Sequence, residues 1–584
     1  MKRLLLSVFI ASVQIAFAQP FSGASGPITT TGPTKTTKVS PDLPISASWQ
    51  LIDVIVQFQS NGNKQGTNFS NFNQAAFNNN VNQVGQSGQV KATLPAINAV
   101  HMQLPLALVQ LLQANPMVKY ITPNRPIKKT LDITTQTVNA ELAWNLGWDG
   151  TGVGVAVIDS GITPVQDLTD TANNSRIVYS QSFISGVSDP TDAYGHGTHV
   201  AGIIGSRGAD STGSSFTRSF KGVAPGVNLI NLRVLDQNGQ GQESDVINAI
   251  QTAIALKNTY NIRVINLSLG TPVFESYTLD PLCQAVEAAW NAGIVVVAAA
   301  GNAGRDNSLG TNGFGTIVSP GNDPDVITVG AANAHGSASR MGDTIATYSS
   351  KGPTLIDHIV KPDLVAPGNG VVSLLASPGA TLFQTATTRV VDSYYETNGS
   401  STVASQDYFR LSGTSMATPV VSGAAAILIE KNPALTPDQV KARLMKTAWK
   451  MLPQYSVGRD AFTLAAFNNQ ADIFTIGAGL LDINAALANN DLATMPALSP
   501  TVTYNSATHC VTLVRSLWGD SVVWGDSVVW GDSIFVGTLN GLSVVWGDSV
   551  VWGDTTLTGF SVVWGDSLNL SATLTALADG DSDQ

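Results

Sequence analysis

Cysteine is nearly absent from this chain, which has only Cys283 and Cys510 among 584 residues. Two cysteines exclude a disulfide framework and a cysteine-rich zinc site, and they leave one bridge as an open alternative. Charged residues are also scarce, at 12% of the sequence, and 41 acidic residues outnumber 30 basic ones. A net charge of −11 provides no basic face for a phosphate backbone, so the composition disfavours nucleic-acid binding.

Long hydrophobic runs are missing as well, apart from one segment at the N-terminus. Hydrophobic residues make up 43% of the chain, which excludes wholesale disorder, and the length suggests about three to five domains. Solubility must come from 54 glycines together with Ser, Thr, Asn and Gln, a composition that indicates a secreted protein.

The N-terminal segment has the three parts of a secretory signal peptide. Lys2 and Arg3 precede a mostly apolar run, Leu4–Ala18, that ends in Ala-Phe-Ala. The alternative is a membrane anchor, but this run has 15 residues with three polar interruptions, whereas a span needs about 20. We therefore expect residues 1–18 to be cleaved off and the mature protein to be secreted, extracellular or in the cell envelope, with no membrane span.

Two further segments precede the main domain. Residues 19–48 are rich in Pro, Ser, Thr and Gly with few apolar anchors, and we interpret them as a linker. Residues 49–126 are expected to form a small α+β module. Its expected elements are a strand at 51–58, a loop at 61–88, a helix at 104–113 and a strand at 117–121.

Residues 131–490 alternate short apolar strands with helices of small residues. This alternation predicts an α/β fold with a mostly parallel sheet flanked by helices. Strands are expected at 153–158, 229–234, 264–267, 294–298 and 326–329, and helices at 245–257, 281–292 and 416–430. Another helix begins after Thr436, where Gln439 completes a capping box. The polar segment 380–409 is expected to be a surface insertion.

The C-terminal part, residues 500–575, contains internal repeats. Trp-Gly-Asp occurs six times with even spacings between the tryptophans, at Trp518, Trp524, Trp530, Trp546, Trp552 and Trp564. Even spacing places side chains on one face of an extended chain, and Gly-Asp is a turn signal, so we expect a repetitive β module. The tryptophans either form a ladder in the core of this module or offer a platform for polysaccharide or surface contact. One carboxylate per turn is sparse for calcium.

Three segments of residues 131–490 carry groups suited to nucleophilic catalysis. Asp159 ends a buried strand, His196 stands between glycines at a helix start, and Ser415 begins an apolar helix whose N–H groups favour negative charge. Each has a simpler explanation alone, since Asp forms turns and Ser caps helices. His196 and His199 lack a further Glu or Cys at metal-ligand spacing, which disfavours a metal site.

The segments VAVIDSG, HGTHVAG and GTSMATP together closely resemble the three signatures of the subtilisin-like serine proteases, the subtilases. The order Asp159, His196, Ser415 is also the order of the triad in subtilisin. The resemblance covers roughly residues 140–487. It implies a subtilisin-like fold and a serine endopeptidase that acts on protein or peptide substrates and needs no cofactor for its chemistry. Ala417 replaces the last glycine of the Gly-x-Ser-x-Gly elbow, which disfavours an esterase on another fold.

The resemblance also implies a role for each site residue. Ser415 would attack the peptide carbonyl, His196 would act as base and then as acid, and Asp159 would orient the imidazole. The side-chain amide of Asn302 and the N–H of Ser415 would bind the oxyanion. Further substrate-binding residues are expected at Ser268, Leu269, Gly270 and Gly301, with a second strand near Gln240 and Gly241.

Specificity and activation follow from the same resemblance. Ala303 follows Asn302, and no obvious carboxylate is placed to select Lys or Arg, so we expect an apolar or broad primary preference. Residues 49–126 resemble an inhibitory propeptide, which would be the protein's own inhibitor. This implies a zymogen that processes itself between Asn124 and Trp144.

Structural calcium is common in the family, and the resemblance leaves it open here. Asp167 lies near one ligand position, but its spacing from Asp159 is short and the loop at 206–220 is unlike the usual ligand loop. No metal ligand is therefore assigned from the sequence.

Two other functions compete with a self-processed protease. One is an adhesion protein in which the repeats matter most and the protease domain is vestigial, but the intact triad residues and Asn302 argue against it. The other is a protease targeted to a polysaccharide by its tryptophans. Deleting residues 512–584 tests the last possibility: lost polymer binding with intact peptide cleavage supports targeting, whereas misfolding indicates a structural tail.

Overall fold

A computed structural model describes most of the chain from Lys38 onward, and every described residue belongs to one unit, Lys38–Gln584. The described residues are 38–40, 43, 49, 51–59, 74–124, 126–129, 135–308, 310–384, 388–461, 463–505, 510–514 and 580–581. The predicted signal peptide, nearly all of the predicted linker and the Trp-Gly-Asp repeats lie outside these residues, so the predictions for them rest on the sequence alone.

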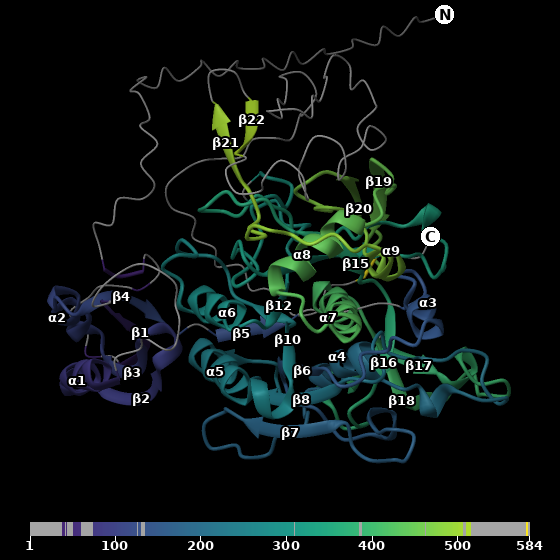
Figure 1. Cartoon of the computed structure of the whole chain (residues 1–584), viewed down its shortest axis with the longest axis horizontal. Coiled ribbons are helices and arrows are strands. Elements are labelled where there is room, and N and C mark those ends of the chain that lie inside the picture. The colour runs from purple at the N-terminus through teal and green to yellow at the C-terminus, as the bar shows by residue number, and fades with distance from the viewer. Residues whose placement is uncertain are drawn as a thin grey trace, which may run out of the picture. The chain divides into compact units, whose positions relative to one another are not determined.

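The N-terminal module is an antiparallel sheet with two helices (Figure 1). Its strands lie in the order β2-β3-β1-β4. The elements are β1 (Leu51–Phe58), α1 (Gln74–Val84), β2 (Gln89–Leu94), β3 (Ala99–Pro105), α2 (Val109–Ala114) and β4 (Val118–Pro123). The aromatic ring of Phe77 in α1 packs edge-on against Phe58 in β1, with 6.0 Å between ring centroids, so α1 covers the sheet.

Two predictions for this module are wrong. The expected loop at 61–88 contains α1, because Phe77 and Val84 recur at helical spacing and both enter the core, although many asparagines surround them. The expected helix at 104–113 starts too early. Leu104 still belongs to β3 and is fully buried on the same face as the alternate residues of that strand.

The main domain is built on an eight-stranded sheet, and the predicted α/β fold is confirmed. The path β14-β13-β12-β10-β6-β8-β7 has β15 paired to β13, and every strand is parallel to its neighbours except β14. The strands are β6 (Gly154–Asp159), β7 (Ile177–Ser182), β8 (Asn228–Arg233), β10 (Ile262–Leu267), β12 (Val295–Ala299), β13 (Ile327–Asn333), β14 (Thr344–Ile345) and β15 (Leu364–Pro367). Except for the edge strands β7 and β14, these strands are apolar and almost entirely buried, because helices cover both faces of the sheet.

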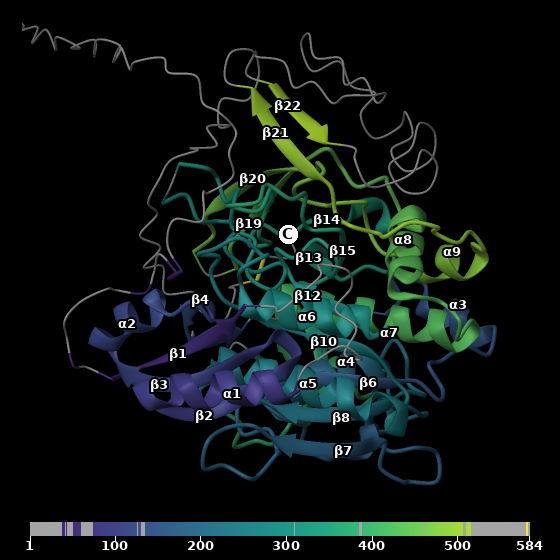
Figure 2. The same ribbon diagram turned by 60° about the vertical axis from the view of Figure 1, so that its left-hand side comes forward.

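Helices α5 and α6 lie on one face of this sheet, and α4 and α7 lie on the other (Figures 1 and 2). The helices are α3 (Ala140–Asn145), α4 (His196–Gly205), α5 (Glu243–Tyr260), α6 (Pro281–Asn291), α7 (Thr414–Lys431), α8 (Pro437–Thr447) and α9 (Ile483–Ala488). Helix α7 is buried from Thr414 to Ile429, in keeping with its run of small and apolar residues. The capping box predicted at Thr436 and Gln439 is confirmed.

Shorter strands surround the sheet. They are β5 (Pro126–Lys129), β9 (Gly241–Gln242), β11 (Leu269–Gly270), β16 (Val371–Leu374), β17 (Arg389–Val391), β18 (Ala404–Leu411), β19 (Tyr455–Arg459), β20 (Ala466–Gln470), β21 (Thr501–Asn505) and β22 (Cys510–Val514). The expected surface insertion at 380–409 is only partly superficial. Its last residues enter β18, where Tyr408 and Phe409 are fully buried, and the ring of Phe409 packs edge-on against His199 of α4.

Candidate active site

A buried carboxylate and imidazole meet at the carboxyl edge of the sheet. Asp159 is the last residue of β6, and His196 is the first residue of α4. The Nδ1 atom of His196 lies 2.7 and 2.8 Å from the two carboxylate oxygens of Asp159, and both side chains are fully buried. Because an ionised carboxylate only accepts hydrogen bonds, Nδ1 carries the proton and Nε2 is the basic nitrogen.

Glycines on either side of His196 make this approach possible. Gly195 has a φ of 103°, a backbone conformation that favours glycine. A Cβ atom on Gly197 would lie 2.1 Å from the carbonyl oxygen of Gly161, so a larger residue would push α4 away from Asp159. The glycines of the predicted segment therefore have a defined steric role.

Asp192 is a positioning residue that the sequence analysis missed. Its buried carboxylate accepts hydrogen bonds from the hydroxyl of Ser160 at 2.7 Å and from the backbone N–H groups of Gly195 and Thr198 at 2.7 and 2.8 Å. These bonds tie the first turn of α4 to the end of β6. An acidic residue four positions before the start of a helix was the available signal.

Ser415 lies in the first turn of α7, which packs against α4. Its Oγ donates a hydrogen bond to the carbonyl oxygen of Ser268 at 3.0 Å, and the Ser268 hydroxyl donates in return to the carbonyl oxygen of Ser415. Backbone N–H groups at the start of a helix stabilise nearby negative charge. The predicted nucleophile thus sits where a developing anion is favoured, and it touches one predicted substrate-binding residue.

Asn302 is held so that its amide nitrogen remains available. Its Oδ1 accepts hydrogen bonds from the N–H and the hydroxyl of Thr414 at 2.9 and 3.0 Å. Within the described part of the chain, the buried Nδ2 has no hydrogen-bond partner. The N–H of Gly301 donates to the hydroxyl of Thr414 at 3.1 Å, so the loop of Asn302 is fixed to the residue before Ser415. A buried donor without a partner is ready to bind a new acceptor.

The predicted substrate-binding strand is paired with a segment of the chain itself. β11, which contains Leu269 and Gly270, pairs antiparallel with Lys129 and Lys128 of β5. On its other side β5 pairs antiparallel with β9, so β5 is the middle strand of three. An extended peptide between two exposed strand edges is held mainly by main-chain hydrogen bonds.

The module that precedes β5 is also joined to the main domain by polar contacts. The buried carboxylate of Glu275 accepts hydrogen bonds from the hydroxyls of Thr122 at 3.0 Å and Tyr120 at 3.3 Å. Asn124 exchanges two hydrogen bonds with Ser244 at the start of α5, at 2.8 and 2.7 Å. These partners come from opposite sides of the contact, so the module is positioned specifically.

Asp167, which lies near a calcium-ligand position of the family in the sequence, is surrounded by hydrogen-bond donors of the protein. Its carboxylate accepts hydrogen bonds from the hydroxyls of Ser206 at 2.9 Å and Tyr408 at 2.7 Å and from the N–H of Asp210 at 3.0 Å. Both oxygens are therefore engaged, which disfavours Asp167 as a metal ligand.

A different acidic cluster has the oxygen atoms that a hard cation requires. Glu287 on α6 places a carboxylate oxygen within 4.8 Å of oxygens of Asp323 and Asp325. Asp323 is fully buried, and its Oδ2 has no hydrogen-bond partner among the described residues. Burial raises the pKa of Glu287 to about 7, with the Asp325 charge adding to the effect, and raises the pKa of Asp323 strongly.

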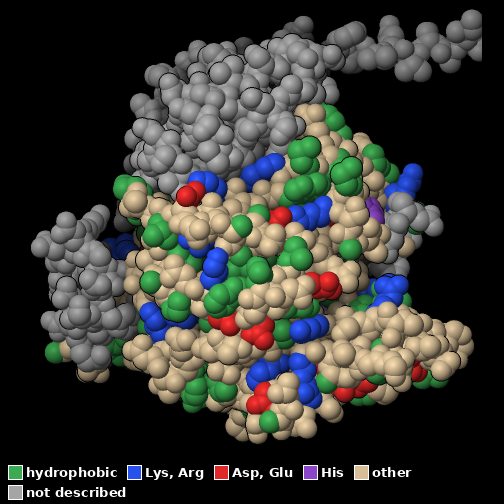
Figure 3. Space-filling model, turned by 45° about the vertical axis from the view of Figure 1, so that its right-hand side comes forward, with side chains coloured by type: hydrophobic (Ala, Val, Ile, Leu, Met, Phe, Trp, Pro, Cys, Tyr) green, Lys and Arg blue, Asp and Glu red, His purple; other side chains and the backbone are tan. Residues whose placement is uncertain are grey.

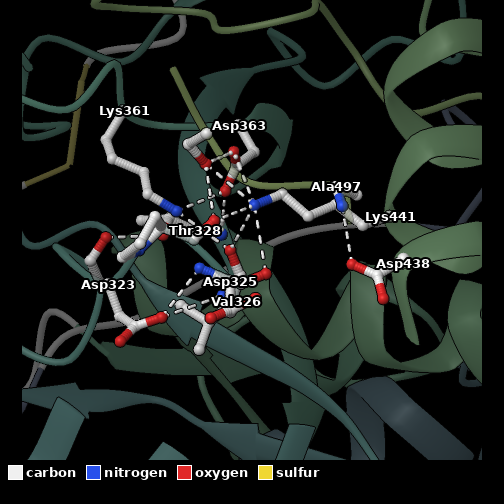
Figure 4. A network of polar contacts seen from close by, with 12 residues as sticks. Asp323, Asp325, Val326, Thr328, Lys361, Asp363, Asp438, Lys441 and Ala497 are labelled. Carbon is white, nitrogen blue, oxygen red and sulfur yellow. Dashed lines mark hydrogen bonds and ion pairs between the residues drawn. The ribbon is translucent and has the colours of Figure 1, made fainter. Parts of the chain in front are cut away.

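Beside this cluster, two buried lysines share one carboxylate (Figure 4). The Nζ of Lys361 lies 2.8 Å from Asp363 Oδ2, and the Nζ of Lys441 lies 3.3 Å from Asp363 Oδ1. Both ammonium groups also donate to the carbonyl oxygen of Val326, at 3.0 and 3.1 Å. Burial lowers the pKa of Lys361 to about 8.

The remaining sequence predictions concern the cysteines and the surface. Cys283 is a free, buried thiol, so it does not pair with Cys510. Among the described helices, none has both the length and the apolar character that crossing a bilayer requires. On the face shown in Figure 3, described side chains of both charge signs are interspersed, as the low charge content suggests.

Comparison with known proteins agrees with this geometry. The sequence model of the Subtilase family matches residues 150–479. The chain is 36% identical over 401 residues to serine protease AprX of Bacillus subtilis, which covers 67% of this chain and 82% of AprX. It is 33% identical over 350 residues to subtilisin DY of Bacillus licheniformis, with 60% and 96% covered, and 32% identical over 385 residues to subtilisin E of Bacillus subtilis, with 65% and 83% covered.

Proposed function

Because the chain belongs to the subtilase family and is a subtilisin-like serine endopeptidase that acts on protein substrates, we propose that Ser415 is its nucleophile. An alcohol is a poor nucleophile at neutral pH and needs a base within reach. His196 removes the proton from Ser415 during attack on the peptide carbonyl and then donates it to the leaving amine. The acyl-enzyme on Ser415 is released by water, which His196 activates in the same way.

Asp159 supports this role of His196 through its hydrogen bond to Nδ1, which fixes the tautomer and stabilises the imidazolium. The oxyanion of the tetrahedral intermediate accepts hydrogen bonds from Asn302 Nδ2 and the N–H of Ser415. The buried Asp159–His196 pair, 2.7 Å apart, is the single observation that carries this assignment.

The protein is made as a zymogen, and residues 49–126 are its inhibitory propeptide. The pairing of β5 with both β9 and β11 supports this, because an extended segment there excludes a substrate from the same strand edges. Cleavage between Asn124 and Trp144 then frees the cleft. Secretion follows from the signal peptide expected at residues 1–18.

Substrates bind as an extended strand along Ser268, Leu269 and Gly270. The primary preference is apolar or broad, because Ala303 follows Asn302 without an acidic residue to select Lys or Arg. A peptide panel that favours Arg over Leu or Phe by tenfold, about 1.4 kcal/mol, would contradict this preference.

Subtilases need no cofactor for peptide cleavage, but Glu287, Asp323 and Asp325 fit a structural calcium ion. Calcium binds carboxylate and other oxygen ligands, and its coordination geometry is flexible. The unpartnered Oδ2 of buried Asp323 supports such a site, because a carboxylate oxygen without a partner is costly in the interior.

The test compares the wild-type chain with Ser415→Ala and with Ser422→Ala, a matched change on the same helix. Ser422 is equally buried, and its hydroxyl donates only to Asn266 at 2.8 Å among the contacts described. We expect wild type and Ser422→Ala to digest unfolded casein and to lose the N-terminal module, as intact mass shows. Ser415→Ala should do neither.

If Ser415→Ala digests casein as well as wild type does, the nucleophile is misassigned. If wild type and Ser415→Ala are both inactive, a subtilisin is added to each of them to remove the module. Activity that then emerges in wild type alone indicates a zymogen that another protease activates, and its absence in both indicates an inactive site.

A further inference from the structure

Gly580 and Asp581, close to the C-terminus, lie against the main domain and are paired through their backbone. The N–H of Ala461 donates to the carbonyl oxygen of Gly580 at 2.9 Å, and Asp581 forms an antiparallel bridge with Asp460. The side-chain amide of Asn369 bonds both backbone groups of Asp581, at 2.8 and 2.9 Å. The dipeptide is therefore held by one isolated β-bridge and by the side chain of Asn369.

The side chain of Asp581 enters a charged pocket. It is only 5% exposed, and its Oδ1 lies 2.9 Å from Nη2 of Arg305. Its Oδ2 accepts a hydrogen bond from the N–H of Thr347 at 2.8 Å, and the Thr347 hydroxyl donates to Oδ1. A carboxylate is buried at tolerable cost only when a cation and donors surround it in this way.

The position before the aspartate has no room for a side chain unless Ser412 or Asn369 moves. A Cβ atom on Gly580 would lie 2.5 Å from Oγ of Ser412 and 2.9 Å from Oδ1 of Asn369. Because Asn369 is engaged by Asp581, it has little freedom to move aside. The residues that contact this dipeptide are therefore complementary to a glycine followed by an aspartate.

The same dipeptide recurs in this chain. Each of the six Trp-Gly-Asp repeats contains Gly-Asp, and five of them continue with Ser, as Gly580-Asp581-Ser582 does. Several segments of the chain therefore offer the chemistry that this surface recognises, and the structure shows which of them is bound.

We propose that Arg305, Thr347, Asn369, Ser412 and Ala461 form a recognition slot for a Gly-Asp segment, filled by Gly580 and Asp581 of the same chain. The slot shares its walls with loops of the candidate active site, since Arg305 lies three residues after Asn302 and Ser412 three residues before Ser415. It uses neither of those residues. The slot ties the end of the chain, beyond the repeats, to the protease domain.

Hydrogen exchange at two backbone amides tests this assignment in the full chain carrying Ser415→Ala, which prevents autolysis. The amides of Thr347 and Ala461 come from separate loops, and both donate to the bound dipeptide. We expect Asp581→Ala and Gly580→Ala each to speed exchange at both amides at least about tenfold. Asp566→Ala, which removes the aspartate of the last repeat, should leave both rates unchanged.

Gly580→Ala leaves every slot residue intact, so it cannot act by damaging the slot itself. The amide of Thr328, which donates to Asp363 at 2.8 Å, reports whether the domain stays folded. Asn369→Ala empties the slot of any occupant. If Asn369→Ala frees both amides but Asp581→Ala does not, another Gly-Asp segment is bound and the assignment is wrong. If none of the variants changes either rate, no peptide occupies the slot and the proposal fails.

Discussion

Replacing Asn302 with alanine is expected to lower kcat by about 10²–10³ while KM changes little. The Nδ2 atom of Asn302 is buried without a partner among the described residues, and Thr414 holds the other end of the amide. A donor fixed in advance needs no reorganisation when the oxyanion forms. One such donor is worth about 2.7–4 kcal/mol in a subtilisin, a relative from which this range is carried over. At about 1.36 kcal/mol per tenfold, that is two to three orders of magnitude in rate.

The assay measures kcat and KM on a chromogenic peptide after a subtilisin has removed the N-terminal module from every variant and has itself been removed. This step is needed because a slow variant would also process itself slowly. Thr414→Val is the matched control. It deletes two hydrogen bonds of the Thr414 hydroxyl, one to Asn302 Oδ1 and one from the N–H of Gly301, but keeps the backbone bond to Asn302. It should therefore lower kcat by less than Asn302→Ala, by at most about thirtyfold, as two neutral hydrogen bonds of about 1 kcal/mol each imply.

Stability must be measured alongside, because Asn302→Ala leaves the donors of Thr414 without an acceptor, at a cost of about 1–3 kcal/mol. A folded Asn302→Ala enzyme that loses less than tenfold in kcat would refute the reasoning. So would a loss expressed entirely in KM, because that would mean that Asn302 binds substrate and transition state equally.

Three further predictions concern stability and activation. Asp363→Ala leaves two buried lysines without their carboxylate and should cost about 3–5 kcal/mol in denaturant unfolding. Asp491→Ala breaks an exposed ion pair and should cost far less, so equal losses would contradict this prediction. Calcium at about one hundred times its Kd should stabilise the wild type by about 2.7 kcal/mol but not Glu287→Gln, and thermal unfolding with calcium or a chelator decides it. Burial, together with the charge of Asp53 on the module, raises the pKa of Asp245 to about 7. The docked state therefore favours the protonated carboxyl of Asp245. The stability that this carboxyl contributes to docking is fully present below its ordinary pKa near 4 and is lost as the pH rises through about 7. The cleaved module should accordingly dissociate more readily at pH 8 than at pH 5.5, and titration of binding against pH should show a weaker dependence in Asp245→Asn.

The fold of the main domain and the pairing of Asp159 with His196 could be predicted because their signals lie within short segments of the sequence. A buried parallel strand is a short apolar run, and the glycines around His196 mark the start of α4 in the sequence, although the contacts that require them come from the distant residues Gly161 and Ala380. The N-terminal module was harder for the opposite reason. Its helix α1 has few apolar residues among asparagines, and its stability comes from packing on the sheet, which no local pattern records.

Polar contacts between distant residues could not be predicted at all. Thr414 and Asn302 are 112 positions apart, and Tyr408 and Asp167 are 241 apart. Nothing in a threonine or a tyrosine by itself announces such a partner, because either residue is equally satisfied by water at the surface. Only the tertiary fold decides which of them is buried, and burial is what makes the partner obligatory.

The same principle separates the Gly-Asp slot from the six repeats that resemble its ligand. In the sequence, Gly580 and Asp581 are one Gly-Asp pair among several, and nothing local distinguishes them from the pairs in the repeats. The bound Gly-Asp segment differs from the repeats by its contacts with the Arg305 cation and with the Ser412 side chain. In the sequence, these two residues lie next to residues of the candidate active site. Two segments that bind each other within one chain share no local sequence pattern. Their contact can therefore be recognised only in the folded structure, where the buried carboxylate of Asp581 meets Arg305.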